Sequence, residues 1–193
     1  MKLVLASASP RRRELLSAIG LDFEVVPSRI VEQRGEDETP EVYVLRLSQE
    51  KAEEVSAKRQ DSWVIGADTT VFIDNAILEK PTDEADAARM LRLIAAREHT
   101  VFTGVTLIGP SARYRESRVV STRVTIIGLT DEEITWYVST GEPMDKAGAY
   151  AVQGIGAMFI SSINGNYTNV VGLPLSVLFD MMRRAGIDPL KPS

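Results

Sequence analysis

The order of the expected strands and helices constrains the fold of this 193-residue chain more than any other feature. Near the start, short apolar strands alternate with helices, which is typical of a parallel sheet. Later, two long β segments, at residues 99–108 and 114–127, are joined only by a turn around Gly109-Pro110, which favours an antiparallel pair. The sequence therefore predicts an α/β fold with a mixed sheet and flanking helices. We expect one domain over residues 1–193, and the same pattern is compatible with two lobes around a cleft.

Turn residues, helix-capping residues, prolines and glycines indicate where the other strands and helices begin and end. Strands are expected at residues 3–6, 23–26 and 63–67, with a hairpin over 71–78 that turns at Asp74-Asn75 and another around Asn164-Gly165, between 157–163 and 167–171. Helices are expected from Ser9-Pro10 to Gly20, from Thr39-Pro40 to Ala57, from a Thr82 cap to Ala96, from Thr130 with a Glu133 capping box to Gly141, and from Pro174 to Gly186.

The residues that the chain lacks exclude several kinds of chemistry. It has no cysteine, which excludes thiolate catalysis, cysteine-ligated zinc, iron–sulfur clusters and a disulfide scaffold. It has one histidine, His99. A metal site would depend mainly on carboxylates, which favour Mg²⁺ or Mn²⁺. The net charge of −5 argues against a protein that coats nucleic acid or an anionic membrane, and no apolar stretch suits a signal peptide or a membrane span. We therefore expect a soluble cytoplasmic protein with neither nucleic acid nor a membrane as partner.

The segment Ser7-Ala8-Ser9-Pro10-Arg11-Arg12-Arg13 is the most informative in the chain. A helix N-terminus carries a partial positive charge and prefers acidic side chains, yet three arginines stand here. A solvated surface run is the simple explanation. However, a buried strand, a turn of small residues and a capped helix together form an anion site, to which arginines add bidentate donors for phosphate. We favour an oligophosphate subsite to which Ser7 adds a hydroxyl, with Arg13 structural or solvated.

Two carboxylates are candidates for the chemistry. Asp68 follows the expected strand 63–67, where it either caps an Asx turn or acts as a metal ligand or general base. Glu32 lies in the polar loop after the second strand, and loop glutamates are mostly solvated. Each carboxylate alone is therefore open to a structural explanation.

Two lysines are equally open. Lys80 precedes Pro81, which holds it extended between a β segment and a helix cap. Lys51 borders the apolar stripe of the 39–57 helix, where it either snorkels to solvent or enters a site.

A glycine-rich segment, residues 141–154, has few reasons to pack as a helix and is typical of an ordered functional loop. It contains Gln153, whose amide can accept from the N3–H of uracil or thymine while it donates to a ring carbonyl. Gln153 is therefore a candidate for reading a base. Asn164-Gly165 and Asn166 are more simply turn residues.

Seven short motifs follow one another in order over nearly the whole chain. They are Ser7-Ala8-Ser9-Pro10-Arg11-Arg12, Glu32-Gln33-Arg34, Glu50-Lys51-Ala52, Gly66-Ala67-Asp68-Thr69, Glu79-Lys80-Pro81, Asp145-Lys146-Ala147-Gly148-Ala149-Tyr150 and Val171-Gly172-Leu173-Pro174. In this order they resemble the Maf family of nucleotide pyrophosphatases. The resemblance implies an inosine-triphosphate-pyrophosphatase-like (Maf/Ham1) fold with a central cleft, and a homodimer. It also implies hydrolysis of a nucleoside triphosphate to the monophosphate and pyrophosphate with a divalent metal.

The resemblance also implies roles for particular residues. Asp68 matches the family's proton acceptor, and Glu32 with Asp68 would hold the metal. Substrate choice would involve Arg11, Thr69 and Gln153, and the motif ending in Tyr150 followed by a glutamine resembles the dTTP/UTP branch. The residues expected to bind the substrate phosphates are Ser7, Arg11, Arg12, Lys51 and Lys80.

The hypothesis from the sequence is a metal-dependent hydrolase of dTTP and UTP that serves nucleotide-pool house-cleaning. Cationic side chains would neutralise the phosphates and Asp68 would take a proton from the attacking water. The alternative is a binding protein without turnover, either a nucleotide sensor or a regulator of septum formation. A phosphatase that removes only the γ-phosphate is a weaker rival.

Overall fold

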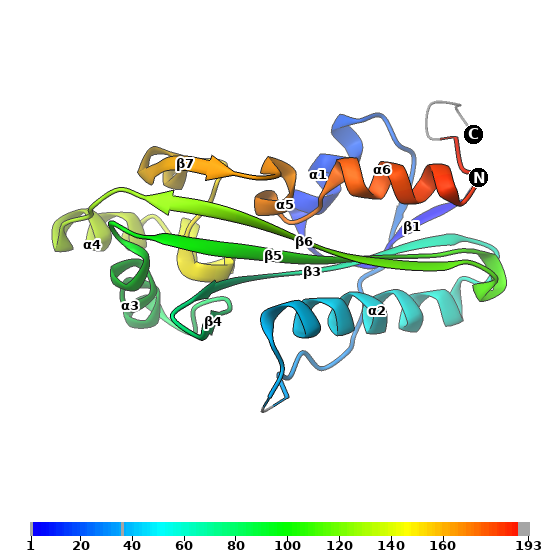
Figure 1. Cartoon of the computed structure of the whole chain (residues 1–193), viewed down its shortest axis with the longest axis horizontal. Helices are drawn as coiled ribbons and strands as arrows, with labels where there is room; N and C mark the ends of the chain where they lie inside the picture. The colour runs from blue at the N-terminus through cyan, green and yellow to red at the C-terminus, as the bar shows by residue number, and fades with distance from the viewer. Residues whose placement is uncertain (1, 36, 189–193) are drawn as a thin grey trace. The chain divides into compact units, whose positions relative to one another are not determined.

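The computed structural model describes residues 2–35 and 37–188, which form a mixed seven-stranded sheet with helices around it (Figure 1). The strands are β1 (Leu3–Leu5), β2 (Glu24–Val25), β3 (Trp63–Ile73), β4 (Ala76–Leu78), β5 (Glu98–Ile108), β6 (Arg115–Ile126) and β7 (Ile160–Asn164). The helices are α1 (Pro10–Ala18), α2 (Pro40–Lys58), α3 (Glu84–Ile94), α4 (Asp131–Ser139), α5 (Tyr167–Val171) and α6 (Leu175–Arg184).

The sheet combines parallel and antiparallel pairs. Its strand order is β2-β1-β3-β5-β6-β7, and β4 pairs with β3 outside this path. β1 is parallel to β2 and to β3, whereas the pairs β3–β4 and β6–β7 are antiparallel. The predicted α/β fold with a mixed sheet and flanking helices is confirmed.

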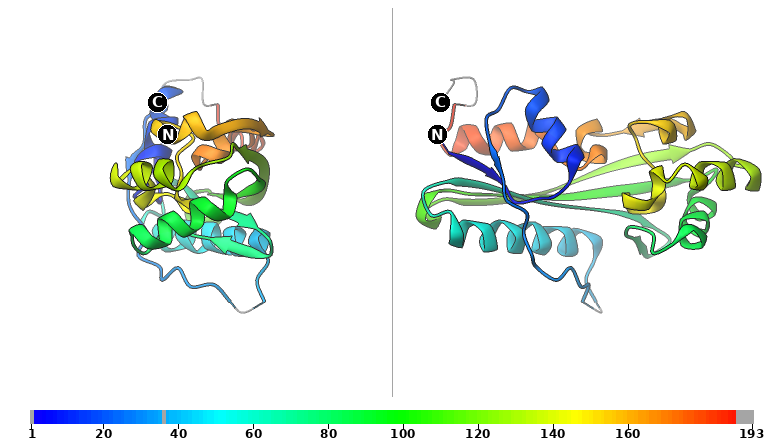
Figure 2. Two further views of the ribbon diagram at one scale, coloured as in Figure 1. Left: turned by 90° about the vertical axis from the view of Figure 1, so that its left-hand side faces the viewer. Right: turned by 180° about the vertical axis from the view of Figure 1, so that it is seen from behind.

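The chain divides into two compact units, and β3, β5 and β6 contribute residues to both. Unit 1 comprises Met1–Asp68, Thr103–Val120 and Gly172–Ser193, and unit 2 comprises Thr69–Phe102 and Ser121–Val171. In unit 1, α2 lies on one face of the strands and α1 and α6 lie on the other (Figures 1 and 2). In unit 2, α3 contacts α4, and apolar residues of both helices share a core with the strands.

Most local signals in the sequence form the expected structure. Thr39 caps α2 by accepting from the Val42 backbone N–H, and Thr130 and Glu133 form the predicted capping box at α4. The Asp74-Asn75 hairpin turn is also present, with φ of 49° and 63° at its two residues. These signals succeed because each depends on residues within a few positions of one another.

Two boundaries differ from the sequence expectations. The strand expected to end at Ala67 continues as β3 to Ile73, so Asp68 lies within a strand and does not cap a turn. The cap of α3 is Asp83, whose side chain accepts from the Asp86 backbone N–H at 2.8 Å; Thr82 lies outside the helix.

The hairpin predicted around Asn164-Gly165 is wrong on its second side. Its first strand, expected from residue 157, begins only at Ile160, because Ile155–Phe159 is a 3₁₀ helix. Tyr167–Val171 is the short helix α5 rather than a strand. The side chain of Asn166 accepts from the Asn169 backbone N–H at 3.0 Å and from the Thr168 hydroxyl at 2.8 Å. This asparagine therefore begins a helical turn, which outweighs the β-branched residues that suggested a strand.

Among residues 2–35 and 37–188, no helix combines the length and apolar character that crossing a membrane requires.

Candidate active site

A buried lysine joins two carboxylates in unit 1. The Nζ atom of Lys51, on α2, lies 2.7 Å from Asp68 Oδ1 and 2.8 Å from Glu32 Oε1. Lys51 and Asp68 are each only 6% exposed, whereas the Glu32 side chain is 52% exposed. Lys51 therefore does not snorkel to solvent, and three residues singled out in the sequence meet at one point.

Glycines bring α2 close enough to the sheet for this contact. A Cβ atom added to Gly66 would lie 2.2 Å from the Ser48 carbonyl oxygen, and one added to Gly104 would lie 2.1 Å from the Val44 carbonyl oxygen. Gly66 and Asp68 lie on the same face of β3, because side chains alternate along a strand. The close approach at Gly66 thus directs the Asp68 carboxylate toward α2.

A buried arginine from α1 stands beside these groups. Arg12 is 8% exposed, and its Nε donates to the Gly172 carbonyl oxygen at 2.8 Å. Its Nη1 donates to the Ser7 hydroxyl at 3.0 Å, and the same hydroxyl accepts from the Ser9 backbone N–H at 3.2 Å. The Ser9 side chain itself makes no capping bond, so it is Ser7 that organises the turn before α1. Arg13 is exposed, as expected for the arginine outside the subsite.

Burial dominates the electrostatics of this cluster. It raises the pKa of the Asp68 carboxyl, although Lys51 and Arg12 oppose the shift. Burial also lowers the pKa of Arg12, and the negative charges of Asp68 and Glu32 oppose that shift. A carboxyl whose pKa is raised is better suited to accept a proton near neutral pH than an ordinary aspartate is.

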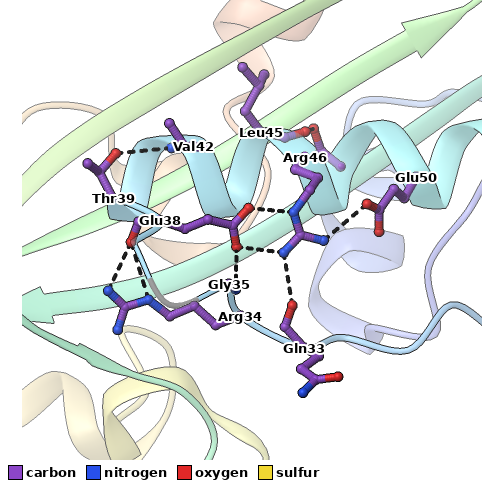
Figure 3. Close-up of polar contacts among 10 residues, drawn as sticks. Gln33, Arg34, Gly35, Glu38, Thr39, Val42, Leu45, Arg46 and Glu50 are labelled. Atoms are coloured by element: carbon purple, nitrogen blue, oxygen red, sulfur yellow. Dashed lines mark hydrogen bonds and ion pairs between the residues drawn. The ribbon is translucent and has the colours of Figure 1, made fainter.

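The loop that carries Glu32 is fixed to α2 by Arg46 (Figure 3). Arg46 Nη2 donates to the Gln33 carbonyl oxygen at 2.9 Å, next to Glu32 in the chain. The guanidinium also donates two hydrogen bonds, of 2.5 and 2.7 Å, to the Glu38 carboxylate and one of 3.0 Å to the Glu50 carboxylate. We call this set of contacts the arginine clamp.

Glu38 completes the arginine clamp from the loop side. Its carboxylate also accepts from the Gly35 backbone N–H at 2.8 Å, and its carbonyl oxygen accepts from the Arg34 guanidinium at 2.9 Å. The bonds from Arg46 and Gly35 hold the pKa of Glu38 at about 2.

The remaining candidates lie elsewhere on the chain. Arg11 is half-buried on α1 in unit 1, while Thr69, Lys80 and Gln153 belong to unit 2, where Lys80 and Gln153 are exposed. The backbone carbonyl oxygen of Glu79, the residue before Lys80, accepts from the Gly148 backbone N–H at 3.1 Å. Unit 1 therefore assembles Ser7, Arg12, Glu32, Lys51 and Asp68, and the three candidates of unit 2 stand on two of its loops and on β3.

Hard carboxylate oxygens are the metal donors that this cluster offers. Asp68 and Glu32 converge on one cation, the Lys51 ammonium, and Glu32 is open to solvent. In the part of the chain that the structure describes, no three His, Cys, Asp or Glu side chains form a metal cluster. Two carboxylates suit Mg²⁺, which commonly takes one or two carboxylates and completes its shell with water and substrate phosphates.

Comparison with known proteins decides the family. The family described as Maf-like protein matches residues 2–185 of this chain. The chain belongs to the Maf family.

Relatives of this Maf protein are similar over nearly their full length. It is 50% identical over 187 residues to the dTTP/UTP pyrophosphatase of Koribacter versatilis, a match that covers 97% of this chain and 96% of that protein. It is 50% identical over 185 residues to the dTTP/UTP pyrophosphatase of Syntrophus aciditrophicus, with coverage of 96% and 90%. The protein of the same name from Caldicellulosiruptor saccharolyticus is 46% identical over 194 residues, with coverage of 98% of each chain.

Solved structures give a weaker likeness. The Ham1 protein of Staphylococcus aureus is 17% identical with a TM-score of 0.46, and the match covers 65% of this chain and 72% of that chain. The corresponding values for a HAM1 protein from Coxiella burnetii are 12%, 0.42, 65% and 73%. Likeness at this level carries no argument about the site.

Sequence motifs do not identify two pairs of residues that hold the loops of this Maf chain. Arg46 and Glu50 have the i, i+4 spacing of a surface helix pair, which does not show that Arg46 also holds the Glu32 loop. Tyr137 lies among core residues on α4, but its hydroxyl is 2.8 Å from the Glu142 carboxylate. Only the three-dimensional contacts single out these residues.

Proposed function

We propose that this Maf protein is a nucleoside triphosphate pyrophosphatase that hydrolyses dTTP and UTP to the nucleoside monophosphate and pyrophosphate. The observation that carries the proposal is the buried contact between Asp68 and Lys51, with Arg12 beside it. It occurs in a chain that is about half identical to proteins named dTTP/UTP pyrophosphatase. We propose that residues 1–193 form one such domain.

The cations of the site would bind the triphosphate. Phosphoryl transfer depends mainly on positioning and on stabilising negative charge, which fixed arginines and lysines do well. Arg12 is held in place by Ser7 and the Gly172 carbonyl, so it needs little reorganisation to meet a phosphate. We assign phosphate binding to Ser7, Arg11, Arg12, Lys51 and Lys80, the last of these from the family resemblance.

Asp68 would act as the general base. Its raised pKa and its burial suit a group that takes a proton from the attacking water. Glu32 and Asp68 would also hold Mg²⁺ or Mn²⁺, which supplies charge neutralisation of the phosphates and a more acidic bound water. Lys51 orients Asp68 through the 2.7 Å contact between Nζ and Oδ1.

Base selection is assigned to Arg11, Thr69 and Gln153. The Gln153 amide matches the acceptor and donor pattern of uracil and thymine, and the names of the relatives support the same pair of substrates. We also propose a homodimer in the cytoplasm that acts on the nucleotide pool and binds no nucleic acid. The net charge of −5 supports the last point.

Product analysis tests the reaction. Purified protein is incubated with dTTP, UTP, CTP, GTP and 7-methyl-GTP, with and without Mg²⁺ or Mn²⁺, and pyrophosphate and phosphate are measured separately. We expect metal-dependent release of pyrophosphate from dTTP and UTP. Phosphate release alone would indicate a γ-phosphatase, and binding without turnover would indicate a nucleotide sensor.

Asp68→Asn tests the catalytic assignment. Loss of a general base typically lowers turnover by a factor of about 10² to 10⁴, so we expect kcat for UTP to fall by at least about 100-fold. Asp61→Asn is the matched control, because Asp61 also pairs with a lysine, Lys2, but both side chains are exposed. Full activity of Asp68→Asn would reject the assignment of Asp68 as the base.

A further inference from the structure

The segment that carries Gln153 has no regular structure to hold it in place. Gln153 is exposed and precedes Gly154, whose φ of 94° is a conformation that other residues rarely adopt. Regular hydrogen bonding resumes only in the short 3₁₀ helix Ile155–Phe159. Contacts other than those of a regular helix or strand must therefore hold the backbone on either side of Gln153.

Two side chains hold both ends of this segment. On the N-terminal side, the Ala151 backbone N–H donates to the Tyr137 hydroxyl oxygen at 3.1 Å. On the C-terminal side, the N–H groups of Ile155 and Gly156 donate to the Glu142 carboxylate at 2.9 and 2.8 Å. The Tyr137 hydroxyl in turn donates to Glu142 at 2.8 Å, which joins the two ends through one bridge. We call this set of contacts the tyrosine–glutamate clamp.

The clamp is anchored in the core of unit 2. Tyr137 is fully buried, and its ring meets that of Phe159 edge to face with centroids 5.1 Å apart. Burial and the bond to Glu142 raise the pKa of Tyr137, so its hydroxyl stays protonated and keeps donating. Although burial opposes the shift, the bonds from Gly156, Ile155 and Tyr137 lower the pKa of Glu142, which stays ionised.

The segment closes tightly over the Glu142 carboxylate. A Cβ atom added to Gly154 would lie 2.4 Å from Glu142 Oε2. Glycine at position 154 suits the backbone angle, and any larger residue would also have to displace the Glu142 carboxylate. The Glu142 carboxylate is therefore packed against the backbone of the segment as well as hydrogen-bonded to it.

We propose that Tyr137 and Glu142 are positioning residues for substrate choice: by fixing both ends of residues 151–156, they set the direction in which the Gln153 amide meets the base. The inference rests on the proposed function and deepens it. Neither residue contacts the nucleotide in this proposal; both act through Gln153.

Base discrimination is sensitive to such positioning. Uracil offers an N3–H donor and an O4 acceptor, whereas cytosine offers an N3 acceptor and an N4 amino group. A fixed amide distinguishes these patterns, but an amide free to rotate can match both. Hydrogen bonds weaken steeply as their angle and distance depart from the optimum. Loosening the segment should therefore reduce the preference for UTP over CTP.

The test compares kcat/KM for UTP and for CTP in Tyr137→Phe and in the control Tyr114→Phe. Tyr137→Phe keeps the buried ring but removes the hydroxyl that links Ala151 to Glu142. Tyr114 likewise donates its hydroxyl to a glutamate, Glu116, but lies in unit 1. We expect Tyr137→Phe to lower the UTP/CTP ratio about tenfold and Tyr114→Phe to leave it unchanged. The ratio does not depend on the active fraction of a preparation, so partial misfolding cannot imitate the effect.

Parallel measurements separate failure of the clamp from failure of the proposed function. If Gln153→Ala lowers the ratio but Tyr137→Phe does not, the positioning role is overturned. If Gln153→Ala leaves the ratio unchanged, the base-reading role of Gln153 fails and the positioning role fails with it, while hydrolysis stands.

Hydrogen exchange of the nucleotide-free protein gives a readout that needs no turnover. We expect faster amide exchange at residues 151–156 in Tyr137→Phe and unchanged exchange at residues 7–13. Unchanged exchange at residues 151–156 would overturn the clamp even in a protein that hydrolyses UTP. If the wild-type protein releases no pyrophosphate from any nucleotide, the proposed function fails. The role of the tyrosine–glutamate clamp in substrate choice then fails as well.

Discussion

The two irregular segments that carry proposed site residues are held by opposite chemistry. In unit 1, a cation on α2 holds the Glu32 loop, because Arg46 binds a carboxylate and a backbone carbonyl of residues 33–38. In unit 2, an anion holds the Gln153 segment, because Glu142 collects two backbone N–H groups and one hydroxyl.

The two clamps also differ in the charges that they contain. Residues 31–35 of the Glu32 loop are exposed, and the clamp of this loop is an ion pair whose side chains are 31% and 16% exposed. The tyrosine–glutamate clamp is a carboxylate bonded to neutral donors and backed by a fully buried tyrosine. An ion pair that is partly open to solvent is weakened by salt, whereas hydrogen bonds from neutral donors to a carboxylate contain no second charge for salt to screen. The same result, an ordered loop, thus has a different dependence on salt and pH in the two units.

The largest expected effect on stability comes from Glu142→Ala. The change leaves three donors without their acceptor; the exposed Ile155 N–H can bond to water, whereas each of the two part-buried donors, on Tyr137 and Gly156, costs about 1–3 kcal/mol. Since the carboxylate is partly open to water, we expect the free energy of unfolding to fall by about 4 kcal/mol in urea titrations. Glu142→Gln is the matched control and should lose about half as much. A loss under about 1 kcal/mol would show that water replaces the carboxylate.

The second largest effect on the free energy of unfolding is expected from acid, through a buried histidine of unit 2. His99 is 3% exposed, and burial lowers its pKa from 6.5 to about 4. Between these values the unfolded chain binds a proton that the folded protein does not, so stability is full above pH 6.5 and is lost as pH falls toward 4. The shift corresponds to about 3 kcal/mol.

The measurement compares the free energy of unfolding between pH 7 and pH 4 in the wild type and in His99→Gln, where the histidine contribution should vanish. The bond of His99 to the Tyr150 hydroxyl, at 2.8 Å, places this loss beside the Gln153 segment. Glu38, by contrast, has its pKa lowered to about 2, so the arginine clamp should persist until the pH falls through that value. Equal pH dependence of the wild type and His99→Gln would contradict the assignment.

Salt should separate the two clamps. Arg46→Met removes the ion pair with Glu38 and the bond to Gln33, and we expect a loss of about 2 kcal/mol at low salt. In 1 M NaCl the difference between the wild type and Arg46→Met should shrink, because the Debye length falls to about 3 Å. The loss in Tyr137→Phe should stay the same at both salt concentrations. Equal salt dependence of the two variants would remove the distinction between the clamps.

The smallest effect is expected from Arg92→Gln, which controls for loss of a charge alone. Arg92 pairs with Asp131, but the side chains are 52% and 78% exposed. Such pairs contribute about 0–1 kcal/mol, so the free energy of unfolding should change by less than about 0.5 kcal/mol. A loss as large as that of Arg46→Met would mean that net charge, and not the clamp, explains the arginine effect.

Much of the site was predictable from the sequence, but its connections were not. The motifs named Ser7, Arg12, Glu32, Lys51 and Asp68, and the structure brings these five together. The strand-end position argued for Asp68 was wrong, because β3 continues through it. Gly66 gave the available signal, since a glycine within a strand often marks a close approach of another backbone.

The sequence by itself determined the elements and their order. Caps, turn residues and apolar spacing act over a few positions, so α2, α4 and the Asp74-Asn75 turn follow from local rules. Only the tertiary structure decided which side chains became partners. The contact of Lys51 with Asp68 depends on how closely α2 packs on the sheet, and the contact of Glu142 with the Gln153 segment depends on the packing of α4 in the core of unit 2. A carboxylate or an ammonium pairs with whichever group folding brings within 3 Å, and that choice is set by packing across the whole chain.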